Sequence, residues 1–164
     1  MKILLFSDTH DYFDEKLIKY IQSVDEVWHA GDIGTLEVCQ QIEKIKPLKA
    51  VYGNIDGQEI RKVYPKNAIF MCEEVKVLIT HIGGYPNKYN LEAQKLILQE
   101  KPALFICGHS HILKIMYDKQ HTLLHLNPGA AGIQGFHQVK TALRFAINGT
   151  EIKNMEIIEL GKPA

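Results

Sequence analysis

Short apolar runs alternate with segments of helical periodicity in the first third of the chain. Residues 2–6, 26–30 and 48–52 are mostly aliphatic or aromatic, which is typical of buried strands. Between them, residues 11–23 and 34–46 carry apolar side chains at roughly helical spacing. A helix between two parallel strands is a βαβ unit, so this third of the chain predicts strands that end at one edge of a sheet.

The pattern changes in the rest of the chain. Residues 67–71 and 75–80 predict two adjacent strands, 91–99 a helix and 103–107 another buried strand. The remaining runs alternate between apolar and polar positions and predict strands at 113–117, 122–126, 138–147 and 152–158. Two mixed sheets with helices outside satisfy these runs better than one open sheet. We therefore expect a single α/β domain over residues 1–164.

The composition excludes several classes of protein. Nineteen Lys and Arg balance nineteen Asp and Glu, which gives no basic footprint for nucleic acid and no polybasic signal for a membrane surface. The three cysteines, Cys39, Cys72 and Cys107, form no C-x-x-C pair, so we expect core thiols in a reducing compartment. The chain starts with a strand, and no apolar run approaches the roughly 18 residues of a membrane span. We expect a cytoplasmic location.

Each of the apolar runs that predict buried strands is followed by Asp, Asn or His. The candidate residues are Asp8, His10, Asp32, Asn54, His81, His109 and His111. Any one of them alone is read more simply as a helix cap or a loop residue. Together they offer oxygen and imidazole ligands without thiolate, which suit Mn, Fe, Zn or Co. Seven ligands exceed the needs of one ion and fit two ions about 3.5–4 Å apart, with Asp32 as the natural bridge.

The order of these motifs resembles the calcineurin-like metallophosphoesterases. The matching motifs are Asp8-x-His10, Gly31-Asp32, Gly53-Asn54-x-Asp56, His81 and Gly108-His109-x-His111. They cover residues 2–132 in order. Residues 7–10, 29–33 and 127–129 are similar to the small prokaryotic phosphodiesterase branch. The resemblance implies a four-layer α-β-β-α sandwich.

The resemblance also implies how the ligands divide and what they do. It places Asp8, His10 and His111 on one divalent metal ion and Asn54, His81 and His109 on the other, with Asp32 bridging. The implied activity is hydrolysis of a phosphodiester by a hydroxide held between the two ions. Asn54 and the cations would hold the non-bridging oxygens. Manganese is the expected metal, and nickel, cobalt, iron, zinc and magnesium remain open.

Two departures from the family pattern concern possible proton donors. Ile55 occupies a position where the larger family has a histidine that is thought to protonate the leaving oxygen. His81-Ile82-Gly83 replaces the frequent His-Gly-His. His29 lies inside a predicted strand, so we expect it to be packed behind the ligands. The last three histidines, His121, His125 and His137, lie outside any motif and have a structural interpretation.

Alternative functions remain open from the sequence. A diester is favoured over a monoester because the two arginines, Arg61 and Arg144, lie outside any motif that would clamp a dianion. The competing hypothesis is a non-catalytic interaction scaffold, because a retromer subunit has the same fold. The complete set of ligands favours the enzyme. The expected partner is a small-molecule phosphoester, and the residues do not decide whether the chain forms a homo-oligomer.

Overall fold

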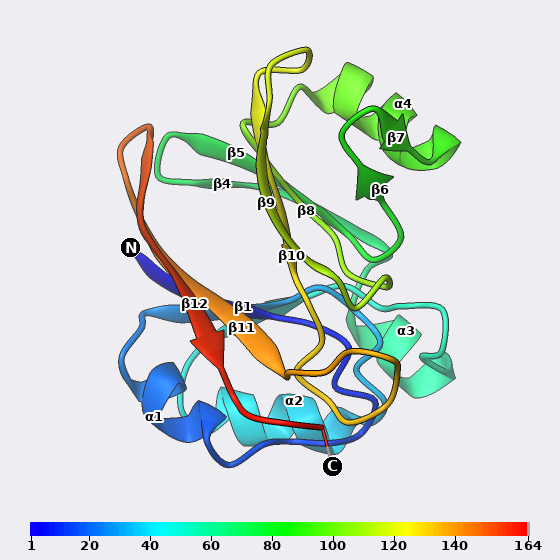
Figure 1. Cartoon of the computed structure of the whole chain (residues 1–164), viewed down its shortest axis with the longest axis vertical. Coiled ribbons are helices and arrows are strands. Elements are labelled where there is room, and N and C mark those ends of the chain that lie inside the picture. The colour runs from blue at the N-terminus through cyan, green and yellow to red at the C-terminus, as the bar shows by residue number, and fades with distance from the viewer. Residues whose placement is uncertain (164) are drawn as a thin grey trace.

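The computed structural model describes residues 1–163 and contains two five-stranded sheets, a short hairpin and four helices (Figure 1). The strands are β1 (Lys2–Phe6), β2 (Glu26–His29), β3 (Leu48–Ala50), β4 (Asn67–Cys72), β5 (Val75–Thr80), β6 (Gly84–Tyr85), β7 (Lys88–Tyr89), β8 (Leu104–Ile106), β9 (Leu113–Asp118), β10 (Leu123–Pro128), β11 (Thr141–Asn148) and β12 (Glu151–Glu159). The helices are α1 (Leu17–Gln22), α2 (Leu36–Glu43), α3 (Gln58–Val63) and α4 (Leu91–Glu100).

Both large sheets are mixed, as the sequence predicts. The first has the order β12-β11-β1-β2-β3, in which β1, β2 and β3 are parallel, β11 pairs antiparallel with β1, and β12 pairs antiparallel with β11. The second has the order β4-β5-β8-β10-β9, with β5, β8 and β10 parallel and the two edge strands antiparallel. Each sheet therefore has three parallel strands whose carboxyl ends share one edge.

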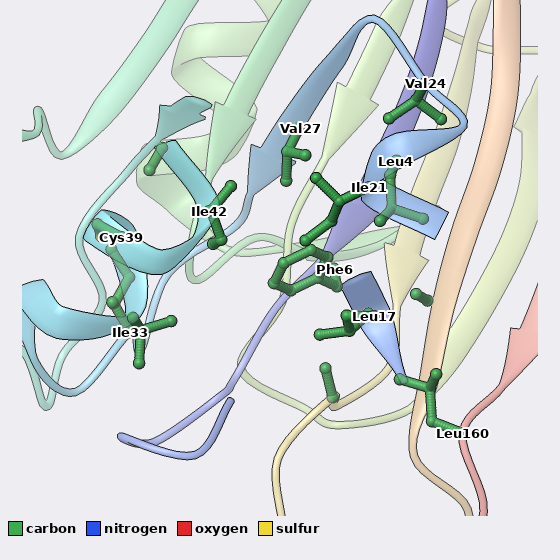
Figure 2. Close-up of a cluster of buried hydrophobic side chains, with 14 of the residues drawn as sticks. Leu4, Phe6, Leu17, Ile21, Val24, Val27, Ile33, Cys39, Ile42 and Leu160 are labelled. Carbon is green, nitrogen blue, oxygen red and sulfur yellow. The ribbon is translucent and has the colours of Figure 1, made fainter. Parts of the chain in front are cut away.

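Three apolar clusters separate four layers. Alternation along β1 sends Leu4 and Phe6 to the outer face of the first sheet, where Phe6 packs with Leu17 and Ile21 of α1 (Figure 2). The opposite face of β1, with Ile3, contributes to the cluster between the two sheets. A smaller cluster lies between the second sheet and α4. Helices α1, α2 and α3 cover one sheet and α4 covers the other, which confirms the four-layer sandwich (Figure 1).

Several boundaries differ from the predicted ones. The helices predicted over 11–23 and 34–46 are only Leu17–Gln22 and Leu36–Glu43. The residues that precede α1 instead form a loop, and two of its first residues, His10 and Asp11, have positive φ angles, which no helix allows. Helix α3 and the β6–β7 hairpin were not predicted, because elements of six and two residues are too short to show a periodicity.

Two other expectations concern the cysteines and the membrane. All three cysteines are free and buried, as expected for core thiols. Among residues 1–163, no helix has both the length and the apolar character that crossing a membrane requires.

Candidate metal centre

The seven predicted ligands lie together where the carboxyl ends of the two sheets meet. Residues that follow β1, β2 and β3 come from the first sheet: Asp8, His10, Asp32 and Asn54. Residues that follow β5 and β8 come from the second: His81, His109 and His111. The His81 Nε2 atom lies 3.8 Å from Asp8 Oδ1 and 3.2 Å from Asp32 Oδ2, so side chains of both sheets share one site.

Asp8, His10 and His111 form the first cluster. One ligand atom from each lies within 4.8 Å of the others. His111 Nε2 is 3.2 Å and His10 Nε2 is 3.8 Å from Asp8 Oδ1. The other carboxylate oxygen, Oδ2, accepts hydrogen bonds from Ser7 Oγ at 2.6 Å and from the His109 backbone N–H at 3.1 Å. These two bonds hold the Asp8 carboxylate with its free oxygen facing the imidazoles.

Asp32, His81 and His109 form the second cluster, again with one ligand atom each within 4.8 Å of the others. Asn54 joins it through a 3.1 Å hydrogen bond between its Oδ1 and His109 Nδ1. His81 Nδ1 lies 2.8 Å from the Ala30 carbonyl, which can only accept, so this nitrogen carries the proton. The lone pair of His81 is therefore on Nε2, facing the carboxylates, as a metal ligand requires.

The Asp32 carboxylate lies between the two clusters. Its Oδ2 atom is 3.5 Å from His10 Nε2 and 3.2 Å from His81 Nε2, which belong to different clusters. Its Oδ1 atom accepts a 3.1 Å hydrogen bond from the Ile55 backbone N–H. One oxygen is thus anchored to the protein and the other faces both sets of imidazoles. This is the position that a bridging ligand would occupy.

The backbone at the ligands is held in an unusual conformation. Five of the seven have left-handed φ angles: Asp8 (55°), His10 (46°), Asp32 (55°), His109 (71°) and His111 (62°). Such conformations are uncommon for residues with a side chain and cost of the order of 1–3 kcal/mol each in sparsely populated regions. They persist because hydrogen bonds to neighbouring strand ends fix this edge of the fold, among them Asp8 N–H to the Gly31 carbonyl at 2.9 Å.

Three glycines precede ligands, and they serve two different purposes. The sequence predicts that Gly31, Gly53 and Gly108 allow sharp turns, but among these three only Gly31 has a positive φ, of 103°. Gly53 is required by close approach instead, because a Cβ atom there would lie 2.1 Å from Asp32 Oδ1. At Gly108 a Cβ atom would lie 2.2 Å from the hydroxyl of Ser7. A positive φ therefore accounts for one of the three glycines, and the close approach of a neighbouring side chain accounts for the other two.

The pKa values of the two carboxylates in the clusters are shifted in the direction that favours cation binding. Burial by itself would raise the pKa of Asp8, but the neighbouring imidazoles of His10 and His111 hold that pKa well below its usual range. Burial also opposes ionisation of Asp32, and the neighbouring His81 lowers the pKa of this carboxyl. Conversely, the pKa of His81 is raised because Asp32 outweighs the effect of burial. Both carboxylates are therefore ionised at neutral pH.

Several polar atoms at the centre have no hydrogen-bond partner within the described residues. They are Asp8 Oδ1, His10 Nε2 and His81 Nε2, and all three are buried. A buried polar atom without a partner costs about 1–3 kcal/mol, so native proteins rarely leave three together. All three face the space between the clusters, and all are oxygen or imidazole nitrogen atoms. The residues present therefore fit divalent metal ions.

His29 lies beneath the loops that carry the ligands and forms hydrogen bonds to them. Its ring is completely buried, with Nδ1 accepting from the Gly31 N–H at 3.1 Å and Nε2 lying 3.0 Å from Thr9 Oγ1. Thr9 in turn donates to the Ile33 carbonyl at 2.8 Å. The ring thus ties the segment between Asp8 and His10 to the loop that carries Asp32.

Replacing His29 is expected to affect stability more than chemistry. The His29→Ala change removes the acceptor of the buried Gly31 N–H, one contact of the Thr9 hydroxyl and a packed ring, so we expect the free energy of unfolding to fall by about 2–4 kcal/mol. Turnover of the folded, metal-saturated variant should fall by no more than about tenfold, the lower end of the loss seen when a residue that supports metal ligands is replaced. Urea unfolding and steady-state assays measure the two effects. A matched control is His121→Ala, because His121 pairs with Asp118 far from the centre. Complete loss of turnover in folded, metal-loaded His29→Ala would contradict this role.

Acidification should destabilise the protein through the same residue. Burial lowers the pKa of His29 to about 4, below its ordinary value of 6.5. The unfolded chain therefore binds this proton more readily, and stability contributed by the neutral ring is lost as pH falls from 6.5 towards 4. The effect is of the order of 3 kcal/mol. Unfolding of metal-free protein across this pH range should show a shallower dependence in His29→Ala than in the wild type.

The surroundings of Ile55 show what holds Asp56 in place. With Ile55 at the position of the family histidine, Asp56 is without the partner that the resemblance implies. Asp56 is instead buried, and its carboxylate accepts hydrogen bonds from the backbone N–H groups of Ile33, Gly34 and Gly53 at 3.1, 2.9 and 2.8 Å. Asp56 therefore joins the loops after β2 and β3. The Ile55 side chain is 47% exposed and packs into no core.

The three histidines outside the motifs have different surroundings. His121 forms a 2.8 Å ion pair with Asp118, in agreement with a structural role. His137 lies at the margin of the metal centre, where its ring packs edge to face against His111 with the ring centroids 5.3 Å apart. No sequence motif marks His137, because the contact depends on the path of the loop before β11. His125 is completely buried, and neither of its ring nitrogens has a partner among the described residues.

Two cavities flank the centre. One of about 290 Å³ lies beside Asn54 and His81 and is also lined by Arg61. The other, of about 530 Å³, begins at His109 and extends along the β6–β7 hairpin to His125. The two clusters are therefore bordered by a cavity on each of two sides.

Comparison with known proteins gives this geometry a family. Residues 1–150 match the calcineurin-like phosphoesterase superfamily domain. The chain belongs to this superfamily. A probable metallophosphoesterase of Methanothermobacter thermautotrophicus is 25% identical over 168 residues, which cover 99% of this chain and 95% of that protein. A second, from Methanocaldococcus jannaschii, is 27% identical over 136 residues, which cover 79% of this chain and 68% of that protein.

Solved structures share the fold. A predicted phosphoesterase from Streptococcus pneumoniae superposes with a TM-score of 0.73 at 23% identity, covering 97% of this chain and 89% of that chain. Vps29 from Entamoeba histolytica, in complex with zinc, superposes with a TM-score of 0.74 at 16% identity, covering 98% of this chain and all of that chain. Superfamily membership and the two clusters together support a metal-dependent phosphoesterase.

Proposed function

We propose that this protein is a phosphodiesterase that uses two divalent metal ions, with manganese the expected metal. The observation that carries the proposal is the position of Asp32 Oδ2, which faces an imidazole of each cluster at 3.5 and 3.2 Å. When bound, such ions would lower the pKa of a water molecule and neutralise the oxygens of a phosphoryl group. Asp8, His10 and His111 would hold one ion, Asn54, His81 and His109 the other, and Asp32 both.

Apart from binding the ions, the protein would orient the carboxylates and the amide that face the substrate. The hydrogen bonds to Asp8 Oδ2 and Asp32 Oδ1 fix both carboxylates before a substrate arrives, so little reorganisation is needed during reaction. The Asn54 amide is held next to His109 at the mouth of the smaller cavity. Its side-chain N–H group is there to donate to a non-bridging oxygen of the scissile phosphate. Asn54 and Asp32 are thus the proposed catalytic residues.

Preference for a diester rests on the basic residues near the centre. Arg61 lines the smaller cavity, although its sequence position gave no hint of this. Its Nε atom donates to the Asp56 carbonyl at 2.6 Å, and the guanidinium lies over the Tyr52 ring, 4.6 Å from the centroid. The Nε–Nη2 edge of the guanidinium is therefore used within the loop, because Nη2 also lies 3.5 Å from the Asn54 carbonyl, and this edge is not free to clamp a second negative charge in the bidentate way a monoester would favour.

A chromogenic assay tests this proposal. Chelator-treated protein is supplied in turn with Mn, Ni, Co, Fe, Zn or Mg and assayed with bis(4-nitrophenyl) phosphate and with 4-nitrophenyl phosphate. We expect hydrolysis that depends on added metal and a higher kcat/KM for the diester. A higher kcat/KM for the monoester would favour a phosphomonoesterase. A protein that binds metal but hydrolyses neither ester would favour a non-catalytic scaffold.

Metal binding should also stabilise the fold, with or without catalysis. The three buried atoms without partners gain ligands when ions bind, and a ligand at 100 times its dissociation constant contributes about 2.7 kcal/mol per site. Two such sites contribute about 5 kcal/mol, so we expect the thermal midpoint to rise by about 10–20 °C on addition of manganese to metal-free protein, and to return on chelation. An unchanged midpoint at saturating manganese would contradict a metal site at this position.

The cytoplasmic location and the formation of a homo-oligomer remain predictions from the sequence.

A further inference from the structure

The larger cavity beside the metal centre has the chemistry of a second binding site. It has a volume of about 530 Å³, within the range of about 300–1,000 Å³ typical of small-ligand pockets. It begins at Gly108 and His109 of the metal centre and extends between the β6–β7 hairpin and β9–β10. A substituent attached to a phosphate at the metal centre would therefore enter it directly.

His125, at the inner end of this cavity, has ring nitrogens that a bound ligand would need to match with hydrogen-bonding groups. The ring is completely buried between Tyr89 and Phe105, with centroids 5.9 and 5.6 Å away, and it lines the cavity. Neither ring nitrogen has a partner among the described residues. Burial lowers the pKa of His125 to about 4, so at neutral pH the ring is uncharged and presents one donor and one acceptor. A ligand with complementary groups would satisfy both.

The lining of the cavity carries two lysines and no acidic residue. Lys88 and Lys114 both line it, and neither takes part in an ion pair in the described chain. The lining contains no Asp or Glu. The Lys114 ammonium lies over the Tyr85 ring, 4.8 Å from the centroid, which keeps it at the rim. These lysines would attract negative charge from the ligand.

The walls supply the apolar part of the site. Ile82, Tyr85 and Ile112 line the cavity and are 42%, 44% and 63% exposed, so a flat ring could cover them. The two amides in the lining are already engaged: Asn127 bonds to the Gly108 carbonyl and Asn90 to the Ile82 carbonyl. Binding of a ligand in this cavity therefore depends on the apolar wall, the neutral imidazole and the two lysines.

We propose that this cavity binds the nucleoside part of a small nucleotide diester that carries a further negative charge beyond the phosphate to be cleaved. A nucleobase combines a flat apolar face with adjacent donor and acceptor groups, which matches the wall and His125. A second phosphate matches Lys88 and Lys114. The inference deepens the proposed function, because it names the substrate class of the same centre and rests on that centre cleaving a diester.

Three chromogenic esters test the substrate class. They are bis(4-nitrophenyl) phosphate, thymidine 5′-(4-nitrophenyl phosphate), and the latter with a 3′-phosphate. We expect the 3′-phosphorylated ester to have the highest kcat/KM, by about tenfold over the unphosphorylated thymidine ester, and Lys114→Met to remove this advantage. The control Lys119→Met alters an exposed lysine outside the cavity and should preserve it. An advantage that is absent in the wild type, or that survives Lys114→Met, would overturn the proposal.

A binding measurement on metal-free protein separates failure of the pocket from failure of the catalytic proposal. Calorimetric titration with thymidine 3′,5′-bisphosphate should show binding that weakens by about tenfold in Lys114→Met, with shifted ring-nitrogen NMR signals of His125 in the wild type. His125→Phe removes two polar atoms without partners, so its thermal midpoint should be equal or higher while binding is lost. Retained binding in His125→Phe, or equal binding of inorganic phosphate, would overturn the nucleoside assignment, whether or not any ester is hydrolysed.

Discussion

Asp32→Asn is expected to abolish hydrolysis and to empty both metal sites together. Asp32 Oδ2 faces His10 on one side and His81 on the other, so no other side chain in the described site can replace it between the clusters. The amide keeps the size of the side chain but removes the negative charge that two cations would share. We expect turnover to fall by at least about 10³-fold, beyond the roughly 10–100-fold typical of residues that only orient ligands.

The measurement combines turnover with elemental analysis of the variant after equilibration with manganese. Bound metal should fall well below that of the wild type. Asp25→Asn makes the same chemical change at an exposed residue whose carboxylate accepts from the Lys2 N–H, and it should alter neither quantity. An Asp32→Asn protein that retains both its metal and near-normal turnover would refute the bridging role.

The second large effect concerns the leaving group. Ile55 replaces the family histidine and supplies no proton, and a positioned general acid contributes about 10²–10⁴-fold, most where the departing alkoxide is poor. We therefore expect the rate to depend steeply on the pKa of the leaving group in a Brønsted plot. Activated aryl diesters should be hydrolysed readily. Alkyl diesters should be hydrolysed about 10²–10⁴-fold more slowly than by an enzyme that protonates the leaving group. A series of substituted phenyl esters measures the slope.

Ile55→His should flatten that slope. The Ile55 side chain is 47% exposed, so the exchange buries no unsatisfied imidazole and should change the free energy of unfolding by less than about 0.5 kcal/mol. Asp56 is engaged with three backbone N–H groups and will not orient the new ring, so the restoration should be partial. Ile55→Gln is the matched control, because it is polar but cannot donate a proton as an acid does. Equal slopes in the wild type and Ile55→His would show that the missing histidine does not limit the reaction.

The strand ends could be predicted because the signal there is local. An apolar run that stops at Asp8 or at His81 shows both the buried strand and the polar side chain that follows it. The rule that parallel strands present their carboxyl ends at one edge then brings these residues together. The division into two clusters came from the family resemblance, and the structure groups six of the seven residues in a way that agrees with it, with Asn54 joined by a hydrogen bond.

Features that depend on distant contacts could not be read from the sequence. The hydrogen bonds between the Asp56 carboxylate and the loop after β2 span more than 20 residues, and no local sequence pattern predicts them. The contact of His137 with His111 likewise depends on the path of a loop, and the surroundings of His125 depend on a hairpin whose two strands have only two residues each and show no periodicity. Helix α1 is short because the residues before it follow the backbone geometry of the ligands instead of their own helical spacing.

The central claim is that one centre with two metal ions hydrolyses a phosphodiester, and a manganese titration tests it most directly. Metal-free protein is titrated with manganese while bound metal and hydrolysis of bis(4-nitrophenyl) phosphate are followed in the same samples. The account predicts that binding saturates at two ions per chain and that activity reaches its plateau only as the second ion binds. Saturation at one ion per chain, with full activity and no further binding at excess manganese, would contradict it.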